Sequence, residues 1–169
     1  MKIPRIALAA YGFALLIIVV DQLTKAWVLD GLGLRFEGQS HPIFDPIFNI
    51  TLVHNEGVSF GLFGDGSARW MLSVFSVVVA GVLGWWALKA DRRLLVSAIG
   101  LIMGGAIGNV IDRIRFGFVV DFLDFSGTGF FPWVFNVADS AITVGVILLI
   151  LDSVLSERAA KVGVAAEKS

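Results

Sequence analysis

The chain contains no cysteine, only two histidines and few charged residues, and each shortage removes a class of protein from consideration. Without cysteine there is no disulfide bond, no thiol nucleophile and no thiolate metal site. Two histidines without a His-Glu-x-x-His pattern argue against a zinc hydrolase. The formal net charge is −1 and no basic stripe runs along the chain, so nucleic acid is not an expected partner.

Hydrophobic residues, by contrast, make up 57% of the 169 residues, while charged residues make up 16%. A soluble domain of this length exposes too much surface to carry so few charges, so the composition indicates an integral membrane protein. A membrane-spanning helix needs about 17–25 mostly apolar residues. Four stretches meet this requirement, at about residues 6–29, 70–88, 94–111 and 135–155. We therefore predict an all-α membrane protein with four transmembrane helices, forming a single integral membrane domain over residues 1–169.

The first apolar run also has one feature of a cleaved signal peptide, because Lys2 and Arg5 precede it. The run is long, however, lacks a small-x-small exit and continues through Asp21 and Lys25. We therefore interpret it as an uncleaved span.

The distribution of basic residues predicts the orientation in the inner membrane, because cytoplasmic loops are enriched in Lys and Arg. Basic residues flank the spans at both chain ends and in the short link between the second and third spans: Lys2, Arg5, Lys89, Arg92, Arg93, Arg158, Lys161 and Lys168. Both termini are thus expected in the cytoplasm, with residues 30–69 and 113–133 in the periplasm. Arg113 and Arg115 run against this rule, which suggests a specific role for at least one of them.

The two periplasmic segments differ in character. Residues 48–55 largely alternate apolar and polar side chains, as a half-buried strand does, and predict a small sheet or hairpin on the outer membrane face. The second segment forms an aromatic-rich periplasmic loop, with Phe116, Phe118, Phe122, Phe125, Phe130, Phe131, Trp133 and Phe135. Because aromatic side chains favour the lipid–water interface, we interpret this loop as an anchoring belt and keep direct contact with substrate as the second interpretation.

Ionisable side chains within the spans are costly and are therefore expected to be paired or functional. Asp21 and Lys25 are four residues apart in the favourable order for an ion pair, which favours a structural salt bridge over direct work on substrate. Asn109 and Arg113 share one face of the third span, and Asp112 is placed on another. Polar residues from separate regions thus gather at the periplasmic boundary: Asp21, Lys25, Asn55, Asn109, Arg113, Asp121, Asn136 and Asp139. A water-accessible pocket at the interface explains this common depth.

Several kinds of hydrolytic chemistry are compatible with such a pocket. A serine–histidine pair is disfavoured, because His41 and His54 are both in the outer segment and no nucleophile-elbow pattern occurs. A serine–lysine pair would use Lys25 with Ser59 or Ser140, but Asp21 one turn away would keep that lysine protonated.

Two carboxylates suffice for amide hydrolysis when they share one proton, because close carboxylates do not both ionise cheaply and titrate as a unit. Asp121 and Asp139 form the preferred pair, since each lies in an apolar frame. Asp112 and Asp124 remain rivals on sequence alone, and Asp152 is expected to be solvated near the cytoplasmic end of the fourth span.

At these residues the chain resembles a known family, the bacterial lipoprotein signal peptidases (signal peptidase II). The resemblance is carried, in family order and spacing, by Asp21-Gln22-Leu23-Thr24-Lys25, Asn55-Glu56-Gly57-Val58-Ser59-Phe60-Gly61, Gly104-Gly105-Ala106-Ile107-Gly108-Asn109 through Asp112-Arg113, Val119-Val120-Asp121-Phe122 and Phe135-Asn136-Val137-Ala138-Asp139-Ser140. Ser59 is a mild departure, since the family more usually has alanine there.

The resemblance implies four transmembrane helices, an outer β-cradle and an outer loop with a short helix. It implies that Asp121 and Asp139 are catalytic and that the supporting polar positions are Asp21, Lys25, Asn55, Asn109, Arg113 and Asn136. It further implies a diacylglyceryl-modified prolipoprotein substrate cut just before the lipidated cysteine, inhibition by the cyclic peptide globomycin, and no metal or cofactor. We expect the protein to act as a monomer in contact with membrane lipid.

One non-enzymatic interpretation stays open. Small helical bundles with intramembrane Asp and Lys can be ion-coupled carriers or subunits of larger assemblies. Such proteins place their charges near the membrane midplane, whereas these charges gather toward one face, which favours chemistry at the interface.

Overall fold

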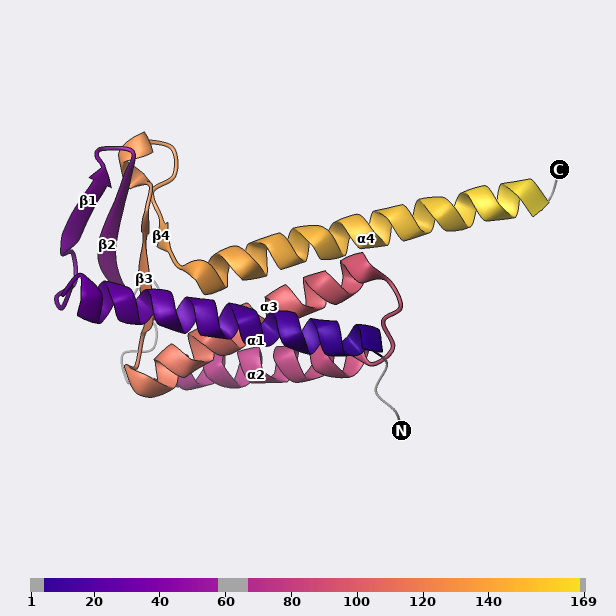
Figure 1. The fold of residues 1–169 in the computed structure, drawn as a ribbon, viewed down its shortest axis with the longest axis horizontal. Helices are drawn as coiled ribbons and strands as arrows, with labels where there is room; N and C mark the ends of the chain where they lie inside the picture. Colours follow the sequence, from indigo (N-terminus) through magenta and orange to yellow (C-terminus); the bar gives the residue numbers. More distant parts are fainter. Residues whose placement is uncertain (1–4, 58–66, 168–169) are drawn as a thin grey trace.

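Four long helices and one small antiparallel sheet make up the protein, as the computed structural model shows for residues 5–57 and 67–167. The helices are α1 (Arg5–Ala26), α2 (Ser67–Ala87), α3 (Arg93–Arg115) and α4 (Val137–Glu167). All four are long and apolar enough to cross a membrane. The sheet stands across one end of the bundle (Figure 1), while the start of α1, the end of α4 and the link between α2 and α3 lie at the other end. The predicted fold class of four helices with a small sheet is confirmed.

Helix α3 is the central helix of the bundle, because small residues let it pack closely on two neighbours. A Cβ atom added to Gly100 would lie 2.6 Å from the carbonyl oxygen of Ala10 in α1. On another face, a Cβ atom on Gly105 would collide with the carbonyl oxygen of Ala138 in α4. Most of α3 is consequently buried within the protein, whereas the other three helices leave most of their apolar surface exposed, as helices facing lipid do.

The sheet has four strands in the order β1-β2-β3-β4, all antiparallel. They are β1 (Ser40–Phe44), β2 (Phe48–Asn55), β3 (Val119–Asp124) and β4 (Val134–Phe135). Strand β2 coincides with the segment whose alternation predicted a strand. Strand β3 was not predicted, because Val119-Val120-Asp121-Phe122 is buried on both faces and so shows no alternation.

Packing beneath the sheet fixes the position of β3. A short π-helical turn, η1 (Trp27–Gly31), continues α1 and contributes Val28 to a cluster with Leu52 of β2 and with Val120 and Phe122 of β3. In the antiparallel register, Val53 is opposite Asp121 and Asn55 is opposite Val119. The end of β2 therefore lies beside the aspartate of β3.

The aromatic-rich segment that follows α3 is held in part by the sheet. A 3-10 turn, η2 (Ser126–Thr128), follows β3, and Phe135 then pairs with Leu123 as part of β4. Helix α4 accordingly begins at Val137 rather than near residue 135, and it extends beyond residue 155 to Glu167. Because the short strand β4 pairs with β3, the first turn of α4 begins directly beside β3.

Candidate active site

Asp139 is held in the first turn of α4 by a reciprocal pair of hydrogen bonds with Asn136. The backbone N–H of Asp139 donates to Asn136 Oδ1 at 2.9 Å, and the backbone N–H of Asn136 donates to Asp139 Oδ2 at 3.3 Å. This is the capping-box arrangement, with asparagine at the N-cap and a carboxylate three residues later. The partial positive charge at a helix N-terminus favours a carboxylate in this turn.

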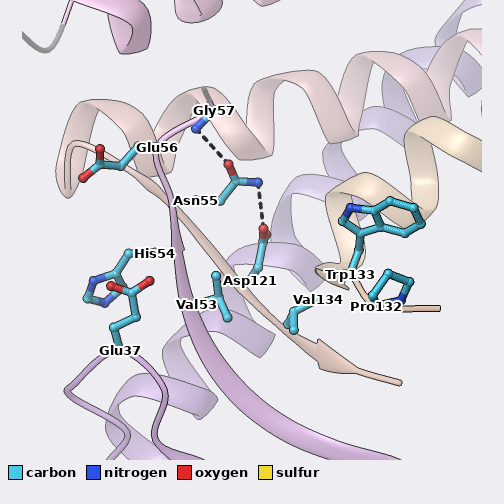
Figure 2. A pocket seen from close by; sticks show the side chains of 10 residues that line it. All are labelled: Glu37, Val53, His54, Asn55, Glu56, Gly57, Asp121, Pro132, Trp133 and Val134. Carbon is cyan, nitrogen blue, oxygen red and sulfur yellow. Dashed lines mark hydrogen bonds between the residues drawn. The ribbon is translucent and has the colours of Figure 1, made fainter. Parts of the chain in front are cut away.

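Asp121 lies on β3 and is only 1% exposed. The Nδ2 atom of Asn136 donates to Asp121 Oδ1 at 2.7 Å, and that of Asn55 donates to Asp121 Oδ2 at 2.8 Å. The Asn55 amide is itself oriented by the backbone N–H of Gly57, which donates to its Oδ1 at 2.8 Å (Figure 2). Asn136 therefore contacts both aspartates, one through its side-chain amide and the other through the cap.

The environment of Asp121 favours its neutral form. Burial, followed by the negative charge of Asp139, raises the pKa of Asp121 from its ordinary value of 3.8 to about 7. Hydrogen bonds from Asn55 and Asn136 act in the opposite direction but do not cancel the effect. A carboxyl group with such a pKa is able to hold a proton near neutral pH and release it during a reaction.

Asn109 completes the contacts of Asp139. Its Nδ2 atom donates to Asp139 Oδ1 at 2.8 Å. Its Oδ1 atom accepts hydrogen bonds from Lys25 Nζ and from Asn136 Nδ2, both at 3.2 Å. Asn109 thus connects Asp139 to a second, fully buried group of charges.

That second group consists of Lys25 between two carboxylates. The Nζ atom lies 2.8 Å from Asp21 Oδ2 and 2.7 Å from Asp112 Oδ2, and all three side chains are at most 2% exposed. Asp21 Oδ1 also accepts the backbone N–H of Ala138 at 3.0 Å, and Asp112 Oδ2 accepts that of Val120 at 3.0 Å. Each of these carboxylates therefore anchors the residue directly before one of the paired aspartates, Asp139 and Asp121.

The placement of Asp112 corrects the sequence interpretation that put it on a different face from Asn109. Residues three apart on a helix are neighbours, so Asn109 and Asp112 both reach Lys25. The three-residue spacing of Asn109 and Asp112 was the signal in the sequence for this shared contact, and the sequence interpretation missed it. Gln22 was also missed: its Nε2 atom donates to Asp112 Oδ1 at 2.8 Å and contacts Asp21 Oδ2 at 3.2 Å.

Two other acidic residues lie away from the pair. Asp124, three residues further along β3, accepts hydrogen bonds from the Thr51 hydroxyl at 2.6 Å and the Ser126 backbone at 2.9 Å. Asp152 was expected to be solvated, but it is buried and lies 2.9 Å from Arg92 Nη2. Its ion pair joins α4 to the start of α3 at the end of the bundle remote from the sheet.

The arrangement gives no support to a serine–lysine pair among the residues described. The Ser140 hydroxyl donates to the backbone carbonyl of Asn136 at 2.9 Å, and Lys25 is occupied by two carboxylates. Ser59 lies outside the described residues. Within residues 5–57 and 67–167, no three His, Asp or Glu side chains are grouped as ligands of a metal ion would be.

Arg113 interacts electrostatically with both aspartates. The negative charges of Asp139, Asp112 and Asp121 all act on it. Its Nη2 atom lies 3.5 Å from the position of a Cβ atom built on Gly57, at the end of β2. In the described part of the chain, its buried Nε atom has no hydrogen-bond partner. Among the described residues, this guanidinium nitrogen is thus left without a partner.

The paired aspartates lie between two cavities of different polarity. A polar cavity of about 640 Å³ adjoins Asp121 and is lined by Glu37, Val53, His54, Asn55, Glu56, Gly57, Asp121, Pro132, Trp133 and Val134 (Figure 2). An apolar cavity of about 300 Å³ adjoins Asp139 and is lined by Phe131, Phe135, Asp139, Ser140, Thr143 and Val144. One carboxylate therefore opens toward the sheet and the other toward the outer surface of α4.

A pair of carboxylates, one buried and one half-buried, at the end of a hydrophobic four-helix bundle and open to a cavity describes a membrane hydrolase of the aspartic class. Known proteins agree with that description. The model of the family described as "Signal peptidase (SPase) II" matches residues 13–155. Curated proteins named "Lipoprotein signal peptidase" are similar along most of their length. The one from Caulobacter vibrioides is 52% identical, covering 93% of both chains, and the one from Shewanella loihica is 46% identical, covering 88% of this chain and 87% of its own.

Solved structures show the same fold. Two structures described as bacterial membrane enzymes superpose with a TM-score of 0.73 and are 30% identical in sequence. The matched parts cover 85% and 90% of this chain and 90% of each of those chains. The chain belongs to the signal peptidase II family. It is therefore a multi-pass enzyme of the inner membrane and an aspartic endopeptidase.

Proposed function

We propose that this enzyme removes signal peptides from diacylglyceryl-modified prolipoproteins, cutting just before the lipidated cysteine, with Asp121 and Asp139 as its catalytic carboxylates. The observation that carries the proposal is that one residue, Asn136, is hydrogen-bonded to both carboxylates. The names of the relatives supply the substrate class. The proposal requires no metal or cofactor.

The chemistry follows from the different surroundings of the two acids. In the resting enzyme the shared proton resides on Asp121, because burial and the negative charge of Asp139 raise the pKa of Asp121 to about 7. Asp139, held by the cap and Asn109, takes a proton from water as that water attacks the scissile carbonyl carbon. Asp121 gives its proton to the carbonyl oxygen, forming a tetrahedral intermediate. When the C–N bond breaks, the proton on Asp139 passes to the leaving amine, and the intermediate's hydroxyl proton returns to Asp121.

The surrounding polar residues position the reactants. Asn55 and Asn136 orient Asp121, and the guanidinium of Arg113, whose Nε has no partner among the described residues, binds a backbone carbonyl of the substrate or an anionic group of its lipid. The Lys25 group acts structurally, because its carboxylates hold the backbone before each catalytic aspartate. This assigns Asp21 and Lys25 to support rather than to the chemical step.

The membrane orientation is part of the proposal. The sheet and both cavities face the periplasm, and the chain ends share the cytoplasmic side with Lys89, Arg92 and Arg93 (Figure 1). In this orientation the substrate's signal helix lies in the bilayer and its scissile bond reaches the aspartates at the outer interface. We further propose that the enzyme works as a monomer and that globomycin blocks it by occupying the same site.

The decisive experiment uses purified enzyme in detergent and a synthetic diacylglyceryl prolipoprotein peptide. Asp121→Asn and Asp139→Asn should each abolish cleavage while the protein still purifies as a folded species. Asp124→Asn, a change on the same strand away from the pair, is the matched control and should retain activity. Substantial turnover by either test variant excludes the pair. Solute flux in liposomes without peptide cleavage would identify a carrier, and loss of activity with a chelator that zinc restores would identify a metal enzyme.

A further inference from the structure

The polar cavity beside Asp121 carries an uneven charge. Glu37 enters it from the loop before β1, and Glu56 follows β2, on the same side as His54, while Pro132 and Trp133 form the opposite wall (Figure 2). Neither glutamate forms an ion pair with any residue that the structure describes. None of the described residues that line this cavity is Lys or Arg.

The cavity itself, rather than the two glutamates, identifies what binds there, because Asp121 forms part of its wall. A substrate whose scissile carbonyl lies between the aspartates extends away from them in two directions. One direction follows the apolar cavity of Phe131, Phe135 and Val144 along α4, and the other follows the polar cavity along the sheet. The signal helix before the cut is apolar, and the acyl chains branch from the cysteine into lipid, whereas the mature segment after the cysteine is an ordinary polar chain. Matching polarity therefore assigns the mature segment to the cavity of Glu37 and Glu56.

We infer that Glu37 and Glu56 are specificity-determining residues, which select against acidic side chains and favour basic ones at the first positions of the mature segment. The inference rests on the proposed function, because it assigns a direction to the substrate of that same site.

The physical reason is electrostatic. Two exposed carboxylates on one wall of a cavity, neither of them paired with a described residue, produce a negative local potential. Exposed charge pairs are individually weak, so the effect is moderate: we expect about a fivefold difference in kcat/KM between a basic and an acidic substrate. Salt screens such interactions over about 10 Å at 0.1 M, so the difference should shrink at high ionic strength.

The test uses three diacylglyceryl prolipoprotein peptides that are identical except at the second and third residues after the start of the mature segment, which are both Lys, both Gln or both Glu. Cleavage is measured in micelles of an uncharged detergent, so that the peptides partition alike. The native enzyme should cleave the Lys peptide fastest and the Glu peptide slowest. In the double variant Glu37→Gln, Glu56→Gln the three values of kcat/KM should converge.

Asp45→Asn provides the matched control, because Asp45 is an exposed acidic residue of the same sheet, in the β1–β2 turn, that does not line the cavity. It should leave the order of the three peptides unchanged. Equal cleavage of all three peptides by the native enzyme overturns the inference and leaves the proposed function standing. Persistence of the full preference in the double variant also overturns it. Failure of the native enzyme to cleave any of the three peptides overturns the proposed function together with this inference.

Discussion

The buried group of Lys25 with Asp21 and Asp112 leads to a prediction about stability that depends on counting charges. Two carboxylates and one ammonium group leave one uncompensated negative charge, which backbone N–H groups of Val120 and Ala138 partly offset. Replacing Lys25 by Met leaves two buried carboxylates without a cation. Removing one partner of a buried ion pair typically costs about 3–5 kcal/mol, so Lys25→Met should lower the free energy of unfolding by about that amount.

Asp112→Asn removes a negative charge from the same buried group, whereas Lys25→Met removes the positive charge. It leaves one carboxylate facing one ammonium group, and its amide oxygen is still able to accept the Val120 N–H. The expected loss is that of weakened hydrogen bonds, about 1–2 kcal/mol. The double variant Lys25→Met, Asp112→Asn should be more stable than Lys25→Met alone, because it buries one unpaired carboxylate instead of two.

These differences are measurable as denaturation midpoints of the purified variants in one detergent, with cleavage of the lipidated peptide assayed on the folded fraction. Lys25→Met should retain more activity per folded molecule than Asp121→Asn, because Lys25 supports the site without entering the chemistry. An Asp112→Asn variant less stable than Lys25→Met would refute the charge count. Equal loss of activity by folded Lys25→Met and Asp121→Asn would show that the lysine takes part in the reaction.

Four further outcomes follow from the site. Because the pKa of Asp121 is raised to about 7, kcat/KM should fall as pH rises through about 7, and a rate independent of pH from 5 to 9 would contradict its role as the protonated partner. The same raised pKa means that ionising Asp121 destabilises the fold. At pH 8 the Asp121→Asn variant should therefore have a higher denaturation midpoint than the native protein, although it is inactive. Asn136→Ala should lose about 1 kcal/mol of stability through the lost cap and about 100-fold in kcat through misplaced carboxylates, and an activity near the native value would refute its positioning role. Arg113→Gln should lower kcat/KM about 10- to 100-fold with an unchanged unfolding midpoint, since the guanidinium stabilises substrate rather than the fold, and a lowered midpoint with native kcat/KM would reverse that conclusion.

Strand β2 and the four helices show how far pattern alone reaches. An apolar run of sufficient length has few alternatives to a spanning helix, and the alternation of residues 48–55 was legible because one face of β2 is buried and the other is not. Strand β3, which carries Asp121, was not predicted from the pattern because both of its faces are buried. Its register against β2 depends on Val28, Leu52 and Val120 meeting under the sheet, and this contact joins three distant parts of the chain.

The sequence by itself determined the membrane class, the number of spans and the set of polar residues at one depth, because these depend on composition, on local periodicity and on the cost of charge in lipid. The tertiary structure alone decided which of those residues touch. Only the packing of α3 between α1 and α4 places Lys25 against Asp112 rather than leaving it with Asp21 alone, and only the short β4 brings the Asn136 cap to Asp121. Helical spacing relates residues within one element, whereas the distances between side chains of different elements depend on how closely their backbones approach. In this protein the glycines of α3 set that approach.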